Sequence, residues 1–314
     1  MKILITGGSG YVGSVLIPRL LKKNCEIINI DTQWFGNYLK KHSKLKNYKM
    51  DYKNIHKIKD KNIDAVIHLA SIANDPMAEI DKNLSWETSA LNTYLLMEFM
   101  VKRKIRKILY ASSGSVYGIK KENKVTEELK LEPLSLYNKV KMVTERVILS
   151  YQNKIIPFII RPSTVCGYSP RMRLDLTVNI LTFNALNNNI INVFGGKQVR
   201  PTIHIEDMCR IYEFFLKKSK KFSGIYNAGY ENASILEIAN TVKKITKSKI
   251  KVVKDRSDPR SYRLNSEKIE KIGFKYTKTY KDAINELCYS YKINKLKQRQ
   301  NSFSLKWLKK VLKK

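Results

Sequence analysis

The beginning of the chain restricts the fold more than any other segment. Residues 2–6 form a short apolar run, and Gly7, Gly10 and Gly13 follow within the segment TGGSGYVG. Residues 12–23 then place apolar side chains at the spacing of one helix face. Glycine permits a tight turn and lets backbone N–H groups approach a diphosphate at the start of a helix. A strand, a glycine turn and a helix in this order indicate a dinucleotide-binding unit.

Further apolar runs continue this pattern along the chain. We expect strands at residues 26–30, 64–70, 107–112 and 156–161, and helices at residues 85–103, 136–152 and 235–246. Strands that alternate with helices predict an α/β fold, with a doubly wound parallel sheet covered on both faces. After about residue 165 the pattern is less regular, and Gly195 and Gly196 between strand-like flanks predict a hairpin at residues 191–200.

The net charge is unusually positive. Lys and Arg number 60 against 27 Asp and Glu, a net charge of +33. Such a charge is typical of proteins that bind nucleic acid or anionic membranes. The basic residues are spread over the whole length, however, without a nucleic-acid-binding motif, in a chain also rich in Asn and Ile. We therefore favour a composition bias and expect no specific nucleic-acid partner, although the charge should attract phosphate-bearing ligands.

The cysteine spacing argues for a reducing compartment, and the hydropathy argues against export and a membrane span. Cys25, Cys166, Cys209 and Cys288 lie far apart, without a CxxC pair. This spacing suits neither a disulfide framework nor a metal site. The apolar run near the start is too short for an export signal, and no run approaches the roughly 18 residues of a membrane span. We expect a cytoplasmic protein without a bound metal.

Asp31 selects between the two nicotinamide dinucleotides. It ends the second expected strand, 18 residues after Gly13. A carboxylate at this position can accept a hydrogen bond from the ribose 2′-hydroxyl and repels a 2′-phosphate, which favours NAD over NADP. The alternative is that Asp31 only caps a turn.

A Tyr-x-x-x-Lys pair supplies a candidate for proton transfer. Tyr137 and Lys141 lie one turn apart on a helix face. A nearby ammonium and an oxidised nicotinamide would both favour the phenolate. The same spacing occurs at Tyr117 and Tyr291 with later lysines, but Tyr137 begins an amphipathic helix. Ser113 ends a strand 24 residues earlier, where it either faces the cofactor crevice or caps the next turn.

Together these segments resemble a known family. TGGSGYVG, Asp31, Asp51, HLA, Asn92, SSGSVYG, YNKVK, RPSTVCGYSPR and RPTIHIEDM occur in order over about residues 1–290. The chain resembles the extended short-chain dehydrogenases/reductases, and more narrowly the NAD-dependent epimerase/dehydratase family that acts on nucleotide sugars in polysaccharide biosynthesis. The resemblance implies an NAD-binding Rossmann domain at residues 1–165, to which residues of about 200–230 return. A smaller α/β substrate domain at residues 166–290 and a basic tail at residues 291–314 follow.

The resemblance also assigns site residues. Those implied in catalysis are Ser113, Tyr137 and Lys141. Those implied in NAD binding are Gly7, Gly10, Tyr11, Val12, Gly13, Asp31, Asp51, Leu69, Ala70, Asn92, Tyr137 and Lys141. Those implied in binding the nucleotide sugar are Ser113, Thr164, Asn179, Arg200, Arg256 and Arg260. Two arginines suit a diphosphate because their forks bind its oxygens in pairs, although surface arginines are the alternative in so basic a chain.

Departures from the family pattern narrow the activity. Gly114 and Ser115 stand where dehydratases and decarboxylases of this kind carry an acid, so both activities are excluded. A C4 epimerase remains, with a keto-sugar reductase as the alternative. A non-catalytic sensor or RNA-binding protein is a remoter alternative, which the intact Ser, Tyr and Lys set argues against. Thr164 and Cys166 depart from the UDP-galactose type, so the sugar stays open. Residues 171–175 (RMRLD) either read a charged sugar or form a structural salt bridge.

Two surfaces predict partners. The helices at residues 85–103 and 136–152 resemble those that pair family members into a two-fold dimer. In the tail, residues 302–314 read SFSLKWLKKVLKK, with Leu305, Leu308 and Leu312 on one side of a helix. This basic amphipathic pattern suits either an anionic membrane surface or packing on the chain's own domain. We favour packing, because a free helix this short is marginal.

Overall fold

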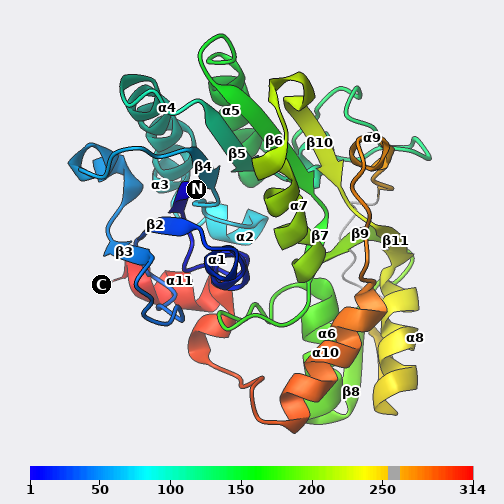
Figure 1. Ribbon diagram of the computed structural model, residues 1–314. Helices are drawn as coiled ribbons and strands as arrows, with labels where there is room; N and C mark the ends of the chain where they lie inside the picture. The colour runs from blue at the N-terminus through cyan, green and yellow to red at the C-terminus, as the bar shows by residue number, and fades with distance from the viewer. Residues whose placement is uncertain (254–261, 314) are drawn as a thin grey trace.

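A parallel sheet forms the centre of the molecule. The computed structural model describes residues 1–253 and 262–313, and its largest sheet has seven strands in the order β10-β6-β5-β4-β1-β2-β3 (Figure 1). Every neighbouring pair in this sheet is parallel. The strands are β1 (Lys2–Thr6), β2 (Glu26–Asp31), β3 (Leu45–Lys49), β4 (Ala65–His68), β5 (Lys107–Ala111), β6 (Ile156–Pro162) and β10 (Gly224–Ala228). The predicted α/β class with a parallel sheet is confirmed.

Helices cover both faces of this sheet. Ile3 and Ile5 of β1 pack with α1 (Gly13–Lys22) and α7 (Ile205–Lys217) on one face. Leu4 points to the other face and packs with α4 (Asn92–Lys102) and α5 (Leu136–Leu149). Successive strand residues point to opposite faces, so strands covered on both sides need the unbroken apolar runs that the sequence contains.

The helix expected at residues 85–103 is interrupted. The structure has α3 (Lys82–Trp86), a π-helical turn η2 (Glu87–Leu91) and then α4. A π turn is wider than an α turn, and apolar spacing alone does not reveal it. The helices expected at residues 12–23, 136–152 and 235–246 are present as α1, α5 and α8 (Ile235–Thr246).

A smaller α/β unit adjoins the carboxyl edge of the large sheet (Figure 1). It contains a three-stranded sheet in the order β11-β9-β7, a two-stranded sheet of β12 and β8, and three helices that share one apolar core. Its elements are β7 (Thr164–Cys166), α6 (Thr177–Asn188), β8 (Ile190–Phe194), β9 (Val199–His204), β11 (Glu231–Ser234), α8, β12 (Lys249–Val253) and α10 (Tyr280–Lys292). Between β9 and β11 the chain returns to the large sheet as α7 and β10.

The predicted hairpin at residues 191–200 is wrong. Strand β8 pairs in parallel with β12, whereas β9 pairs with β7 and β11. The side chain of Gln198 accepts from the Gly196 backbone N–H at 2.7 Å and donates to the Phe194 carbonyl at 2.7 Å. These bonds satisfy backbone groups at the turn, and the two flanking strands then diverge into different sheets.

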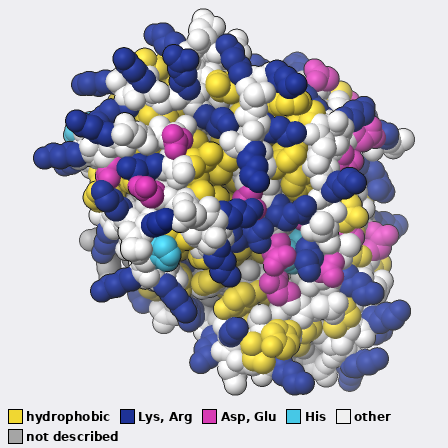
Figure 2. Space-filling model, viewed as in Figure 1, with side chains coloured by type: hydrophobic (Ala, Val, Ile, Leu, Met, Phe, Trp, Pro, Cys, Tyr) yellow, Lys and Arg dark blue, Asp and Glu magenta, His cyan; other side chains and the backbone are white. Residues whose placement is uncertain are grey.

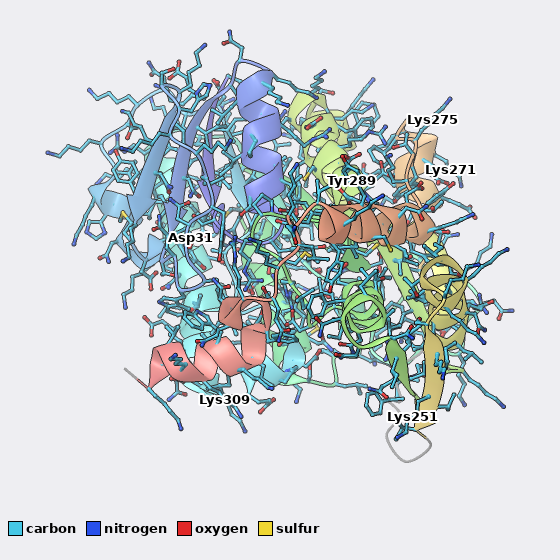
Figure 3. The ribbon with its side chains drawn as sticks, turned by 90° about the horizontal axis from the view of Figure 1, so that it is seen from below. Asp31, Lys251, Lys271, Lys275, Tyr289 and Lys309 are labelled. Carbon is cyan, nitrogen blue, oxygen red and sulfur yellow. The ribbon has the colours of Figure 1, made fainter. Side chains whose placement is uncertain are left out.

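The tail packs on the chain's own Rossmann domain. Helix α11 (Ser304–Leu312) buries Leu308 completely in a cluster with Trp34, Ile72 and Met77. The indole Nε1 of Trp307 donates to the Trp34 carbonyl at 2.6 Å. In Figure 3 the labelled Lys309 extends from the outer side of this helix. The favoured expectation of packing is what the structure shows.

The surface charge is distributed. Figure 2 shows Lys and Arg side chains scattered over the whole visible face, with acidic side chains between them. On this face the basic side chains form no single patch, as a composition bias predicts. Within the described ranges, no helix has the length and apolar content needed to cross a membrane.

Candidate active site

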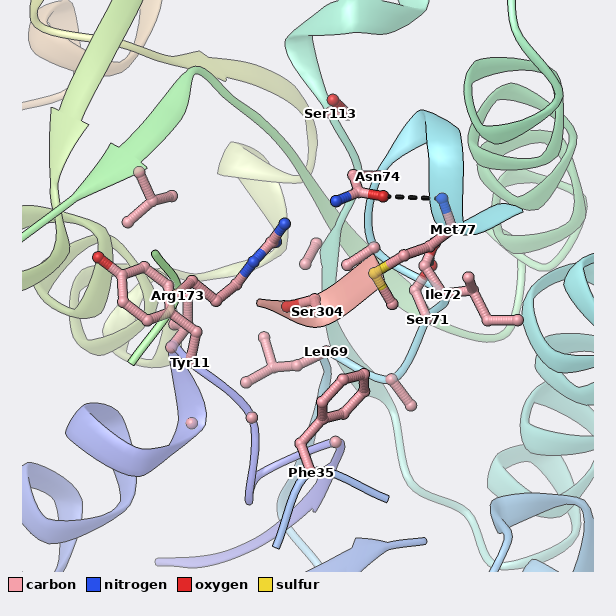
Figure 4. A pocket seen from close by; sticks show the side chains of 18 of the residues that line it. Tyr11, Phe35, Leu69, Ser71, Ile72, Asn74, Met77, Ser113, Arg173 and Ser304 are labelled. Atoms are coloured by element: carbon pink, nitrogen blue, oxygen red, sulfur yellow. Dashed lines mark hydrogen bonds between the residues drawn. The ribbon is translucent and has the colours of Figure 1, made fainter. Parts of the chain in front are cut away.

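A cavity of about 550 Å³ lies along the carboxyl ends of the sheet strands. Asp31 ends β2, Ala111 ends β5 and Pro162 ends β6, and all three line it. Figure 4 shows Ser113 and Phe35 at opposite ends of this cavity, with Arg173 extending between them. Open parallel sheets bind their ligands at this edge, where strand order reverses and a crevice opens.

The glycine loop forms one wall of the cavity. Gly7 has a φ of +75°, and a Cβ atom there would lie 2.6 Å from the backbone nitrogen of Ala70. A Cβ atom on Gly13 would lie 2.4 Å from the Gly8 carbonyl oxygen. Any larger residue would therefore open the turn. Gly7, Gly10, Tyr11, Val12 and Gly13 all line the cavity, so its wall is backbone that a ligand can approach closely.

Asp31 both organises the loop and faces the cavity. Its Oδ2 accepts from the Ser9 backbone N–H at 2.9 Å, and its Oδ1 accepts from that of Gln33 at 2.6 Å. Burial raises the pKa of this carboxyl, against the lowering effect of these backbone hydrogen bonds. Asp31 is therefore both a turn residue, through these two hydrogen bonds, and a residue of the cavity lining.

The other expected cofactor residues divide into two groups. Asp51, Leu69 and Ala70 line the cavity beside the glycine loop. Asn92 is buried and is not among the lining residues. Its side-chain amide instead donates to Asp51 Oδ1 across 3.5 Å, so the structure places Asn92 behind Asp51.

Ser113, Tyr137 and Lys141 line the cavity together. Ser135 begins α5 by accepting a hydrogen bond from the Asn138 backbone N–H at 3.2 Å, which fixes the turn that carries Tyr137. The Lys141 ammonium lies 5.9 Å from the centre of the Tyr137 ring. Ser113 also accepts from the Ser115 backbone N–H at 3.2 Å, so it caps the following turn as well.

Burial controls the protonation of this group. It raises the pKa of Tyr137 to about 12, against the lowering effect of the Ser113 hydrogen bond. It lowers the pKa of Lys141 to about 7, and the nearby Glu145 carboxylate opposes this shift. Both shifts disfavour the charged form of the side chain, because burial removes the water that would solvate a phenolate or an ammonium.

The tyrosines with the same lysine spacing are placed differently. The Tyr117 hydroxyl accepts from Arg161 Nη1 at 2.7 Å and donates to Asn227 Oδ1 at 2.8 Å. The Tyr291 ring packs edge-on against Phe183. Neither tyrosine is among the lining residues, whereas Tyr137 is. Position in the fold thus resolves an ambiguity that spacing left open.

The expected substrate residues are also divided. Thr164 and Arg200 line the cavity. Asn179 does not; it accepts from the Gly167 backbone N–H at 3.0 Å and donates to the Tyr11 hydroxyl at 3.0 Å, so it joins two loops. Arg256 and Arg260 lie outside the described residues. No group of three or more potential metal-binding side chains occurs in the described part of the chain.

The segment at residues 171–175 contributes both a salt bridge and cavity wall. Arg173 donates to Asp175 through Nε and Nη2, at 3.0 and 2.9 Å. Arg171, Arg173 and Asp175 all line the cavity. Of the two interpretations of this segment, the salt bridge is present, and its side chains also line the cavity where a ligand could contact them.

Sequence reasoning missed three parts of the cavity lining, one of which is the loop after β2 that contains Trp34 and Phe35. The loop after β4 contributes Ser71 to Met77, in which Asn74 accepts from the Met77 backbone N–H (Figure 4) and donates to Asp175 at 3.2 Å. The tail contributes Ser304 and Leu308. The apolar residues Ile72, Ala73 and Met77 after HLA were a signal for the wall that follows β4. No local signal indicated that the tail returns to the cavity.

Comparisons with known proteins agree with this arrangement. The model of the NAD dependent epimerase/dehydratase family matches residues 3–229. The UDP-glucose 4-epimerase of Lactobacillus helveticus is 27% identical over 271 residues, covering 78% of this chain and 82% of that protein. The uncharacterized UDP-glucose epimerase YtcB of Bacillus subtilis is 31% identical over 267 residues, again covering 78% and 82%.

Solved structures extend the similarity to nearly the whole chain. The UDP-glucuronic acid 4-epimerase of Bacillus cereus, in complex with UDP-glucuronic acid and NAD, has a TM-score of 0.80 at 27% identity. The alignment covers 93% of this chain and all (100%) of that one. The UDP-N-acetylglucosamine 4-epimerase of Methanobrevibacter ruminantium shares the fold, with a TM-score of 0.84 at 20% identity over 93% and 98% of the chains. This chain belongs to the NAD-dependent epimerase/dehydratase family and is an enzyme whose cofactor is NAD.

Proposed function

We propose that this enzyme inverts the configuration at C4 of a UDP-sugar through a transient keto-sugar. One observation carries the proposal: Ser113, Tyr137 and Lys141 border the same cavity as the glycine loop and Asp31. A sugar hydroxyl beside Tyr137 would thus lie next to the reactive end of a bound dinucleotide. The epimerases of Lactobacillus helveticus and Bacillus cereus support the reaction class.

The residues present fit NAD. The backbone at Gly7 and Gly13 leaves no room for side chains, as close approach to a diphosphate requires. The Asp31 carboxylate would hold the adenosine ribose, and Lys141 would hold the ribose next to the nicotinamide. When bound, NAD supplies the acceptance and return of a hydride.

Three side chains take part in proton transfer in the proposed mechanism, each in a different role. Tyr137 takes the proton of the C4 hydroxyl as the C–H bond is broken, and returns it when the bond is re-formed. The Lys141 ammonium stabilises the phenolate by its charge. Ser113 donates a hydrogen bond to the reacting oxygen and keeps it in reach of Tyr137. Inversion requires that the keto-sugar rotate in the cavity between removal and return of the hydride. The returning hydride then reaches the opposite face of C4.

Product analysis tests this proposal directly. The enzyme is incubated with UDP-glucose, UDP-N-acetylglucosamine or UDP-glucuronic acid, and the nucleotide sugars are separated and identified by proton NMR. We expect a C4 epimer from at least one of them, without net change of absorbance at 340 nm. Stoichiometric consumption of NADH with a keto-sugar, and no epimer from any substrate, would instead establish the reductase.

An acidic sugar is the second candidate within this class. Arg173 lines the cavity together with Tyr137, and its charge opposes the burial that raises the pKa of Tyr137. A carboxylate on C5 could compete with Asp175 for the Arg173 guanidinium. The Bacillus cereus epimerase bound to UDP-glucuronic acid supports including this substrate. Arg173→Gln should then reduce kcat/KM for UDP-glucuronic acid more than for UDP-glucose.

We infer that the enzyme is a homodimer. Helix α3, the π turn and α4 expose four large apolar side chains: Trp86, Leu91, Tyr94 and Leu95. Helix α5 packs beside α4, so two copies could form a four-helix interface about a two-fold axis. Light scattering at micromolar concentration should give twice 36.5 kDa, and Tyr94→Glu with Leu95→Glu should give the monomer.

We also propose a cytoplasmic location and a role in supplying sugars for polysaccharide biosynthesis. All four cysteines are free, and Cys166 and Cys209 are buried, which suits a reducing compartment. Fractionation of cells that produce the enzyme with an N-terminal tag should recover it with cytosolic markers. Recovery with the membrane fraction at high salt would contradict this location.

A further inference from the structure

A buried arginine faces the cavity with unsatisfied donors. The Arg171 side chain is only 4% exposed, and it lines the cavity. Its Nε and Nη1 atoms are buried and have no hydrogen-bond partner among the residues that the structure describes. An arginine buried for structural reasons pairs these groups with a carboxylate or carbonyls, because an unmade hydrogen bond to a charged group is costly. The two free donors therefore point to an anionic ligand.

The guanidinium is held in place from two sides. It lies over the Phe35 ring, 4.2 Å from the ring centre. Its Nη2 donates to the Ser304 hydroxyl in the first turn of α11 at 3.1 Å. These contacts fix the plane of the guanidinium while leaving Nε and Nη1 free, which is the preorganisation that a binding residue needs.

The loop that carries Arg171 is fastened to the glycine loop. Ser169 donates from its hydroxyl to the Tyr11 carbonyl at 2.8 Å. The Tyr11 hydroxyl donates back to the Gly167 carbonyl at 2.6 Å. Arg171 thus extends from a loop anchored on the segment whose backbone would receive the dinucleotide diphosphate.

Arg171 borders the same cavity as Asp31 and Tyr137, the residues expected at the two ends of a bound NAD. On one side, its charge opposes the burial that raises the pKa of Asp31, the residue expected at the adenosine ribose. On the other side, burial and the charge of Arg173 lower the pKa of Arg171 to about 10. Arg173 in turn acts on Tyr137, at the reactive end. The diphosphate is the anionic part of NAD, and it lies between the two riboses.

We propose that Arg171 is a ligand of the NAD diphosphate and that helix α11 completes this subsite by holding the guanidinium through Ser304. Nε and Nη1 would donate to phosphate oxygens opposite the backbone N–H groups of the glycine loop. The negative diphosphate would compensate a buried positive charge that forms no ion pair at contact distance with the described residues. Arg200 is assigned to the diphosphate of the sugar nucleotide, so the two arginines would serve different ligands.

Calorimetry on the enzyme stripped of nucleotide tests this proposal without any sugar. NAD, ADP-ribose and adenosine are titrated into wild type and Arg171→Gln. We expect about 10- to 100-fold weaker binding of NAD and ADP-ribose, the range for a lost charge-assisted hydrogen bond. Adenosine, which has no phosphate, should bind equally to both proteins. Arg171→Lys, which retains the charge, should recover part of the affinity, and UDP should bind Arg171→Gln as it binds wild type.

Two further variants separate ligand binding from packing. Arg299 also lies over an aromatic ring, 5.0 Å from the centre of Tyr38, but it is exposed and does not line the cavity. Arg299→Gln should therefore leave NAD affinity unchanged. Ser304→Ala should weaken NAD and ADP-ribose in the same pattern as Arg171→Gln, by a smaller factor.

The outcomes that would overturn the proposal are distinct. If Arg171→Gln binds NAD as wild type does and only melts at a lower temperature, Arg171 is structural. If adenosine affinity falls as much as NAD affinity, the effect lies in the adenosine site and not at the diphosphate. Phosphorus NMR adds an independent readout, because the two ³¹P resonances of bound NAD should shift between wild type and Arg171→Lys. Unchanged resonances would contradict direct contact.

Discussion

The ammonium nitrogen of Lys141 lies 2.6 Å from the carbonyl oxygen of Ala111, the last residue of β5. This hydrogen bond ties α5 to the carboxyl end of the sheet, at the point where the cavity begins. It uses one of three N–H donors of the ammonium. Under the proposed mechanism another N–H would donate to a ribose hydroxyl of NAD, while the contact with Ala111 holds the ammonium 5.9 Å from the centre of the Tyr137 ring.

Lys141 should give the free energy of unfolding a characteristic pH dependence. Burial lowers its pKa to about 7 in the folded protein, against an ordinary value of 10.5. Between these values the unfolded chain binds more protons, so stability rises with pH by up to about 1.4 kcal/mol per unit. Below about pH 7 both states are protonated and this contribution to the slope disappears. Urea unfolding of the NAD-free enzyme from pH 6 to 10 should show this rise of the free energy of unfolding with pH in wild type. The rise should be smaller in Lys141→Met. Parallel curves for the two proteins would exclude a contribution from Lys141.

Removing the Tyr137 hydroxyl should abolish most of the activity. Tyr137→Phe loses the proton acceptor, which we expect to reduce kcat by about 10²-fold or more, the scale of general-base catalysis. Binding of NAD, measured by calorimetry, should persist. Tyr291→Phe is the matched control, because Tyr291 has the same lysine spacing but lies outside the cavity lining. Normal turnover by Tyr137→Phe would refute the proposed mechanism.

The charge of Asp31 should determine cofactor choice. We expect NAD to bind at least about tenfold tighter than NADP, because the carboxylate repels a 2′-phosphate. Asp31→Asn keeps a side-chain oxygen that can still accept from Ser9 or Gln33, but removes the charge. This variant should narrow the ratio of the two dissociation constants in calorimetry. An equal ratio in wild type and variant would assign selectivity to another residue.

A buried ion pair between α5 and β6 should contribute strongly to the free energy of unfolding. Arg161 donates to Glu145 through Nε and Nη2 at 2.9 and 2.7 Å, and both side chains are almost fully buried. Glu145→Ala leaves the guanidinium uncompensated, which costs about 3–5 kcal/mol. The exposed pair of Lys124 and Glu267 is the control, and Glu267→Ala should change the urea midpoint little. Equal midpoint shifts would argue against a special role for the buried pair.

The tail helix should stabilise the fold and ignore membranes. Leu308 is fully buried, so Leu308→Ala should lower the free energy of unfolding by about 2–5 kcal/mol. Exposed Lys309 on the same helix is the control, and Lys309→Ala should leave the melting temperature unchanged. Sedimentation with anionic vesicles at low salt should leave the enzyme in the supernatant. Salt-sensitive pelleting that depends on residues 302–314 would revive the membrane interpretation.

The predictability of the sheet follows from burial on both faces. Strands such as β1 and β6 are covered twice, so their sequences are nearly continuous apolar runs that can be recognised locally. Strand β3 at the sheet edge is half exposed and reads LKNYK, and it was not predicted. The pairing of β8 and β9 with other strands was also not predictable, because local residues indicate a strand but do not select its partner.

The candidate site divides in a similar way. Gly7, Asp31 and Tyr137 stand in motifs whose chemistry requires them, so the sequence indicated them. Phe35 and Ser304 have no such motif, and they reach the cavity only because distant segments pack together. Asn92 and Asn179 matched the family pattern by position, yet the structure places both beside the lining rather than in it.

The contact between Arg171 and Ser304 also sets an order in time for biosynthesis. The glycine loop leaves the ribosome first, whereas Ser304 is translated nearly 300 residues later. At about 5–20 residues per second, this delay is roughly 15 to 60 s. A nascent chain can therefore form its sheet long before the cavity has its last wall. If Arg171 and Ser304 bind the diphosphate as proposed, capture of the dinucleotide at full affinity waits until residue 304 has been translated and α11 has packed, so the cofactor would select these chains over shorter nascent ones.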